Sequence, residues 1–137
     1  MNSYKILPHT ADVRLRVTGE TLKDLFEQAV LGMARILSKT KFNLKSQNLN
    51  LKIKVDANNP TVLLIDFLSE VLTASCEEKA IFTKVNFLKI SETEVETEIF
   101  GTKVDSFDED IKAVTYHEAK IIKNKKGDLE TTILFDI

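Results

Sequence analysis

Residues that could bind a metal ion stand near both ends of the sequence. His9, Thr10 and Asp12 place an imidazole, a hydroxyl and a carboxylate just before a strand-like run, and Asp136 stands next to the terminal carboxylate of Ile137. Carboxylate oxygens are the ligands that hard divalent cations prefer. If the fold brings these carboxylates together, they repel one another unless a positive group lies between them. Their chemistry therefore depends on whether the two ends of the chain meet.

Two kinds of positive group could lie between the carboxylates. One is a divalent cation, and the other is Lys112, which would only neutralise them through a salt bridge to Asp12 or Asp136. Asp12 also has a plain structural alternative, as the cap of a turn or helix. His9 and His117 could add nitrogen ligands for zinc, but no HxH, HExxH or CxxC spacing accompanies them. A lone histidine in a strand is more often a hydrogen-bonded structural residue, so both remain supporting candidates only.

Other kinds of chemistry have little support. The sequence contains no GxSxG, P-loop or GxGxxG motif, so neither a serine nucleophile nor a nucleotide site is indicated. The single cysteine, Cys76, is typical of a reducing compartment, and no apolar run suggests a membrane span, so we expect a cytoplasmic protein. With 19 basic and 21 acidic side chains the net charge is −2, whereas binding to phosphates needs a basic excess on at least one face. We therefore expect no direct contact with nucleic acid.

The periodicity of apolar residues predicts an α+β fold for a single domain over residues 1–137. Apolar residues recur at helical spacing over about 21–38 and 60–78, with Thr21 and Asn59 as N-caps. The resulting order, β-α-β-α-β-β-β-β, packs two helices on a largely antiparallel sheet. Alternation of apolar and polar residues predicts the strands, with a break at Gly101 and an acidic loop over 105–110. The predicted strands cover 4–17, 49–55, 81–90, 94–100, 112–123 and 129–136.

The last two predicted strands form a hairpin whose loop fixes their register. A loop centred near Lys126 places Asp136 opposite Thr115 to His117. Lys112 then lies just beyond the paired end, near the terminal carboxylate. Lys112, Asp136 and that carboxylate should therefore gather at one rim of the sheet, and Asp12 joins them if the first strand runs into the same rim.

Several segments of the chain also carry a resemblance to a known family. They are His9-Thr10-Ala11-Asp12 leading to Gly19 and Leu25-Phe26, then Leu63-Leu64 to Glu70, then Gly101, the IKAVTYH run from Ile111 to His117, and the terminal Asp136-Ile137. In this order and spacing the chain resembles archease over essentially its whole length. The HTAD, KAVTYH and final DI segments are specific together, although each alone would be weak.

The resemblance implies a function that the residues alone could not name. Archease is a small, non-enzymatic cytoplasmic accessory protein of the RtcB-type RNA ligase: it promotes guanylylation of the ligase and repeated turnover in tRNA splicing and RNA repair. By resemblance, Asp12, Asp136 and the terminal oxygen of Ile137 bind a divalent metal, with calcium expected and magnesium or manganese as alternatives. Lys112 resembles the residue that the family needs, with the two aspartates, to activate the ligase. RNA is then reached only through the ligase.

Two other classes of function stay open at this point. A metal-dependent phosphoester hydrolase could use the same carboxylates to activate water. A chaperone-like binding module would need an exposed apolar patch, and the apolar residues here already belong to regular stripes.

Overall fold

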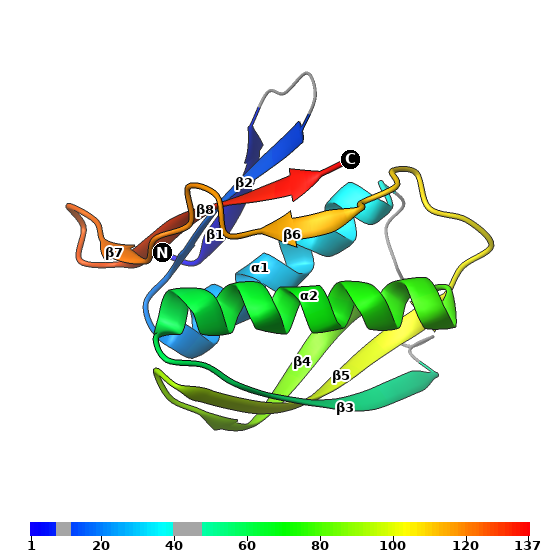
Figure 1. The fold of residues 1–137 in the computed structure, drawn as a ribbon, viewed down its shortest axis with the longest axis horizontal. Coiled ribbons are helices and arrows are strands. Elements are labelled where there is room, and N and C mark those ends of the chain that lie inside the picture. Colours follow the sequence, from blue (N-terminus) through cyan, green and yellow to red (C-terminus); the bar gives the residue numbers. More distant parts are fainter. Residues whose placement is uncertain (8–11, 40–47) are drawn as a thin grey trace.

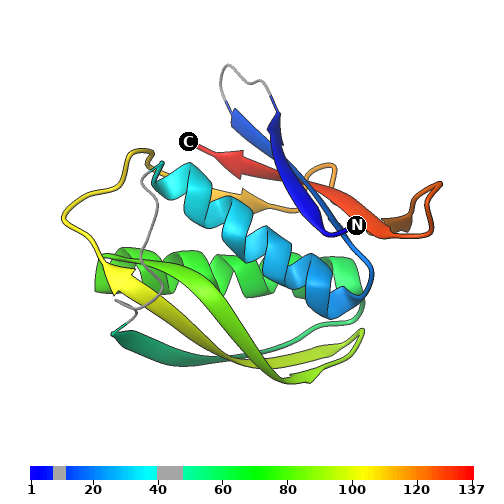
Figure 2. The same ribbon diagram turned by 180° about the vertical axis from the view of Figure 1, so that it is seen from behind.

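The computed structural model describes residues 1–7, 12–39 and 48–137, which form three layers. Two helices, α1 (Leu22–Leu37) and α2 (Pro60–Glu78), lie between two antiparallel sheets (Figures 1 and 2). The first sheet contains β1 (Ser3–Leu7), β2 (Asp12–Gly19), β8 (Leu129–Asp136) and β6 (Ala113–Thr115) in that order, and β7 (Ile122–Lys123) also pairs with β8. The second sheet contains β3 (Leu49–Asp56), β5 (Glu94–Lys103) and β4 (Ala80–Ile90).

The α+β class, the two helices and the antiparallel pairing are confirmed, but the single predicted sheet is two sheets. The residues of α2 show why both are needed. Leu63, Leu64 and Ile65 are consecutive and all fully buried, so over this turn more than half of the circumference of α2 is covered, with Val62 and Asp66 partly exposed on the remaining side. A helix that is apolar on several sides must be covered on several sides. Accordingly, α2 contacts β3 in one sheet and β6 in the other.

Both helices begin at the predicted caps. The Thr21 hydroxyl accepts a hydrogen bond from the Asp24 backbone N–H at 3.2 Å, and the Asn59 side chain accepts one from the Val62 N–H at 3.0 Å. These bonds satisfy N–H groups that the first helical turn leaves without a partner. At its other end α2 stops at Lys79, which takes a left-handed conformation with φ of 50°.

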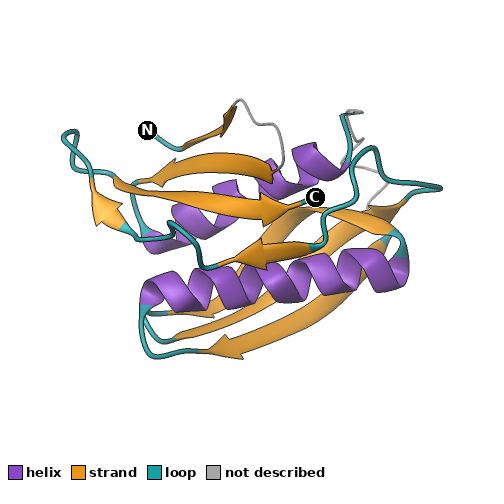
Figure 3. Ribbon diagram, turned by 45° about the horizontal axis from the view of Figure 1, so that its top comes forward, coloured by secondary structure: helices purple, strands orange, loops and turns teal. Residues whose placement is uncertain are grey.

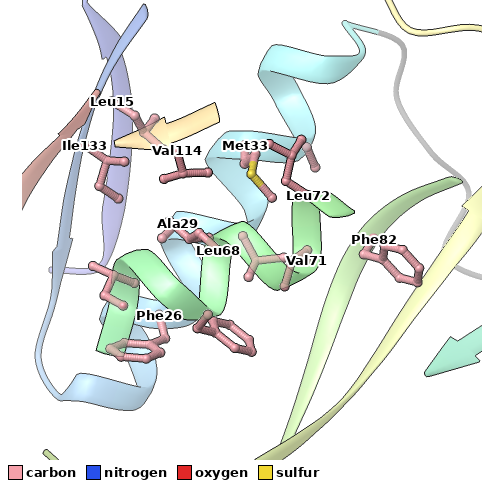
Figure 4. Packing of buried hydrophobic residues seen from close by; sticks show 14 of the residues in the cluster. Leu15, Phe26, Ala29, Met33, Leu68, Val71, Leu72, Phe82, Val114 and Ile133 are labelled. Carbon is pink, nitrogen blue, oxygen red and sulfur yellow. The ribbon is translucent and has the colours of Figure 1, made fainter. Parts of the chain in front are cut away.

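One continuous core joins the three layers. Figure 4 shows Leu15 and Ile133 of the first sheet facing the helices, and Phe82 on the opposite side within the second sheet. Phe26 of α1 and Phe67 of α2 stack with ring centroids 5.7 Å apart. The helices therefore hold the two sheets together through side chains that are almost completely buried.

Three predicted strand boundaries are wrong. The run 4–17 is not one strand but two antiparallel strands, with Ser3 opposite Thr18 and Leu7 opposite Arg14. The run 112–123 is also two strands, β6 and β7, which are separated by a turn in which Glu118 has φ of +66°. There the Thr131 hydroxyl accepts the hydrogen bond from the Lys120 N–H, in place of a strand carbonyl.

The third wrong boundary is Gly101, which lies inside β5 and does not end it. A Cβ atom at this position would come within 2.7 Å of both the Ile81 carbonyl oxygen and the Phe82 ring on β4. Glycine is therefore required here by the close approach of two strands, and not by a turn.

We expect Gly101→Ala to lower the free energy of unfolding by about 1–3 kcal/mol, because β4 must move away from the added methyl group. Chemical denaturation measures the change. The neighbouring Thr102→Val is the control: the buried Thr102 hydroxyl has no hydrogen-bond partner among the described residues, so its removal should be neutral or stabilising. Equal losses for the two variants would contradict the steric explanation.

Within the described residues, neither helix is long and apolar enough to cross a membrane.

Candidate metal-binding rim

The two aspartates from opposite ends of the chain are direct neighbours in the first sheet. β2 and β8 pair in antiparallel register from Gly19 opposite Leu129 to Asp12 opposite Asp136. Residues opposite each other in such a ladder have Cα atoms about 4.5–5.5 Å apart and side chains on the same face. Asp136 is exposed and Asp12 is partly exposed, so both carboxylates are accessible from solvent.

Lys112 is fixed beside this pair through its backbone. Its N–H donates a hydrogen bond of 2.7 Å to the carbonyl oxygen of Asp136, and the next residue, Ala113, lies opposite Asp136 in β6. The side chain of Lys112 is exposed and, within the described part of the chain, forms no ion pair with Asp12 or Asp136. The salt bridge considered as an alternative for Lys112 is therefore not formed. We call Asp12, Lys112, Asp136 and the carboxylate of Ile137 the acidic rim.

Core residues hold each strand of the acidic rim in place. Val13 in β2 and Phe135 in β8 are the inward-facing neighbours of Asp12 and Asp136, Val114 of β6 lies opposite Phe135, and each of the three is buried. Ile111, just before Lys112, is 3% exposed, and Ile137 packs against the same core. Because the side chain of Ile137 is held by the core, the carboxylate that follows it is held near Asp136. In Figure 1 the C-terminus accordingly lies beside the start of β6.

The predicted register is right at the hairpin and wrong at the rim. Near the loop Ile122 lies opposite Glu130, as a loop centred near Lys126 requires. Asp136, however, lies opposite Ala113 and not opposite Thr115 to His117, because residues 116–121 leave the ladder between β6 and β7. The error does not separate Lys112 from Asp136, since Lys112 directly precedes the paired residue.

Only one of the two histidines considered as supporting ligands lies within the described residues. His117 is exposed and lies in the turn that follows β6. Its backbone N–H donates a hydrogen bond to the Thr115 hydroxyl at 3.3 Å. His9 lies outside the described residues. Across the described ranges no three His, Cys, Asp or Glu side chains gather into a group that could hold a metal. The described donors at the rim are therefore two side-chain carboxylates and the terminal carboxylate, all of them oxygen ligands.

Opposed like charges at Asp12 and Asp136 make the acidic rim unfavourable by itself. Like charges directly opposite in a sheet are destabilising, and no lysine or arginine among the described residues forms an ion pair with either carboxylate. The Asp12 carboxylate also accepts no hydrogen bond from another described residue, so no cap of a turn or helix is seen for it there. The rim thus carries three carboxylates and one lysine, and within the described part of the chain no ion pair neutralises either aspartate.

Two contacts near the rim were not predicted from the sequence. Arg14 binds Glu118 through Nε at 3.1 Å and Nη2 at 3.2 Å, which ties β2 to the turn after β6. The Tyr116 hydroxyl donates a hydrogen bond to Asp66 of α2, and this bond raises the pKa of Tyr116. Together these two contacts tie the segment that follows Lys112 to β2 on one side and to α2 on the other. Neither pair shows a sequence signal, because its members are far apart in the chain.

Comparison with known proteins assigns the family. Residues 4–137 match the model of the Archease protein family (MTH1598/TM1083). The chain belongs to the archease family. It is 32% identical over 132 residues to protein archease of Methanosarcina barkeri and 30% identical to that of Methanosarcina mazei, covering 90% of this chain and 89% of each relative. The resemblance read from the HTAD, KAVTYH and DI segments is therefore confirmed.

Solved structures support the fold of this archease family member. Protein 1598 of Methanobacterium thermoautotrophicum has a TM-score of 0.74 at 22% identity, with coverage of 98% of this chain and 99% of that one. An archease of Thermotoga maritima, described as a possible chaperone, has a TM-score of 0.66 at 17% identity, with coverage of 97% and 96%. At these identities the likeness concerns the fold alone.

Proposed function

We propose that this protein is a non-enzymatic activator of an RtcB-type RNA ligase, promoting guanylylation of the ligase and its repeated turnover in tRNA splicing and RNA repair in the cytoplasm. The observation that carries the proposal is the pairing of Asp12 with Asp136, beside Lys112, at one accessible rim. Membership of the archease family supports it.

The donors of the acidic rim fit a hard divalent cation. Asp12, Asp136 and the carboxylate of Ile137 offer only oxygen, which suits calcium and also magnesium or manganese. Calcium takes six to eight oxygen ligands, so three carboxylates leave positions for water or for groups of a partner. When bound, the cation would neutralise the opposed carboxylates and polarise an oxygen ligand supplied by the partner. This open site is what an accessory protein needs in order to act on another protein's active site.

Lys112 has a separate role in this proposal. Its backbone is fixed by the hydrogen bond to Asp136, while its ammonium group forms no ion pair with the described rim carboxylates. It can therefore contact a carboxylate of the ligase or a nucleotide phosphate during guanylylation. Such charge-assisted hydrogen bonds are stronger than neutral ones and hold a partner group in one position.

We expect Asp136→Asn to raise the melting temperature in the presence of EDTA. The variant removes the repulsion between two opposed carboxylates, an unfavourable interaction of about 0.2–1 kcal/mol. In saturating calcium the order should reverse, since the wild type gains binding free energy that the variant lacks. Thermal melts with and without calcium measure both effects, and Asp105→Asn in the exposed acidic loop is the control. A wild type whose melting temperature does not respond to calcium, magnesium or manganese would contradict the metal site.

The test of the proposal is guanylylation of an RtcB-type ligase with GTP and manganese, with and without this protein. We expect faster guanylylation and more than one round of ligation per ligase molecule. If the ligase is unaffected and this protein alone cleaves a phosphoester, the hydrolase alternative replaces the proposal.

The chaperone alternative has no specific observation in its favour. The large apolar side chains that are exposed in the described part of the chain include Ile6 on β1, Leu88 on β4 and Ile122 on β7. Single exposed apolar residues on different elements are ordinary and do not form a binding patch.

A further inference from the structure

The outward face of the first sheet carries a row of positive charge behind the acidic rim. Lys5 of β1 lies opposite Arg16 of β2, and Arg16 lies opposite Thr132 of β8. Residues opposite each other share a face, so the three side chains form one row across the strands. Lys5 and Arg16 are both exposed. Figure 3 shows the strands of this sheet side by side, with the helices on one side of the sheet only.

Lys5 and Arg16 are opposed like charges, as are Asp12 and Asp136. Neither cation forms an ion pair with another residue in the described ranges. Such an arrangement is destabilising by itself and becomes favourable when an anion binds across both groups. Arg14 lies between the two rows but is already paired with Glu118.

The groups around this row are those that commonly bind phosphate. Arginine and lysine side chains with neighbouring hydroxyls make most contacts to nucleic-acid backbones. Here Thr132 lies on one side of Arg16. In the next row the Thr18 hydroxyl donates to the Met1 carbonyl oxygen at 3.0 Å and accepts from the Ser3 hydroxyl at 2.7 Å, so these two hydroxyls are already engaged. Beyond Arg16, a groove of about 280 Å³ is lined by Lys120 and Thr132 but also by Glu118 and Glu130, so its charge is mixed and the phosphate contacts fall to the row itself. The cations are spread over an open surface, which suits an extended strand.

We propose that the row of Lys5, Arg16 and Thr132 binds the phosphates of a single-stranded RNA. The row lies four residues along β2 from Asp12, about 13–14 Å from the acidic rim. One single-stranded RNA molecule could therefore contact both the row and the acidic rim. This goes beyond the proposed function, in which RNA is reached only through the ligase. The preference for RNA over DNA rests on that function, whereas phosphate binding does not.

The overall charge of −2 does not oppose this inference, because the charge is unevenly distributed. A basic excess is needed only on the face that contacts phosphates. The outward face of the sheet also carries Asp12, Asp136 and Glu130, so the positive charge is local to Lys5 and Arg16, which the pairing of β1 with β2 places next to each other.

Binding of a short fluorescein-labelled single-stranded RNA, followed by anisotropy at several salt concentrations without any ligase, tests the inference. We expect the double variant Lys5→Gln, Arg16→Gln to bind about tenfold more weakly, with a salt slope reduced by about 1.4, or about 0.7 for each phosphate that the variant no longer neutralises. The double variant Lys52→Gln, Lys54→Gln removes equal charge from exposed positions of β3 in the second sheet and should bind as the wild type does. Lys5→Arg, Arg16→Lys keeps the charges and should retain binding.

Equal binding by the wild type and the Lys5/Arg16 variant, or an equal loss for the Lys52/Lys54 control, would overturn the inference. So would competition by free GTP as effective as that by unlabelled RNA, since it would indicate a mononucleotide site. If the Lys5/Arg16 variant bound RNA normally but bound the ligase more weakly, the row would be a site for an acidic protein surface. Because the assay contains no ligase, its result is independent of whether the protein activates one.

Discussion

Asp12→Asn and Asp136→Asn should each reduce stimulation of ligase guanylylation by at least about 10- to 100-fold. Loss of groups that only support a metal ligand already costs this much, and these carboxylates are proposed as the ligands themselves. Asparagine keeps the size of the side chain, so strand pairing at the rim is retained. The measurement is the rate of guanylylation with each variant at equal concentration.

Lys112→Ala belongs to the same experiment and should show a loss of similar size. A charge-assisted hydrogen bond is worth about 1.5–3 kcal/mol, which corresponds to roughly 10- to 100-fold in rate. Lys112→Arg keeps the charge and should restore part of the stimulation. A C-terminal extension after Ile137 removes the terminal carboxylate from its position and should act as the aspartate variants do.

Matched surface changes separate the acidic rim from charge in general. Asp105→Asn and Lys125→Ala alter exposed residues of the described loops and should leave the stimulation unchanged. If the rim variants, shown to be folded by circular dichroism, stimulated the ligase as fully as these controls do, the rim could not be the working surface.

Phe67→Ala should lower the free energy of unfolding by about 3–5 kcal/mol, the largest effect on stability that we expect. Phe67 is fully buried in α2 and stacks on Phe26 of α1 at 5.7 Å, in the layer that both sheets cover. Removing the ring leaves a cavity between the two sheets. Neither sheet can move in to fill this cavity without losing its contacts with a helix elsewhere. Urea denaturation measures the loss as a lower midpoint at unchanged slope.

Two controls define what the Phe67 result means. Phe67→Leu keeps most of the apolar volume and should cost about 1–2 kcal/mol. Leu88→Ala removes a comparable side chain that is 52% exposed, and should change stability by less than about 0.5 kcal/mol. A loss for Phe67→Ala no larger than that for Leu88→Ala would mean that the helix layer does not hold the sheets together.

The sequence by itself determined the local structure and the family. Thr21 and Asn59 cap the helices because side-chain oxygens of these residues accept backbone N–H groups a few residues away, which is a local interaction. The antiparallel hairpin of β7 and β8 followed from its loop for the same reason. The segments that identify the archease family are also contiguous, so they could be read without a fold.

Only the tertiary structure decided how those pieces combine. From the sequence, Gly101 looked like the end of a strand. The contact that requires glycine there, with the Ile81 carbonyl, comes from another strand and is not visible in the local sequence. Residues 4–17 looked like one strand because pairing between β1 and β2 has no signature in their alternation. The opposition of Asp12 with Asp136, and of Lys5 with Arg16, depends on registers between strands that the sequence does not encode locally. The sequence supplied the charged residues, and the pairing of strands made them neighbours.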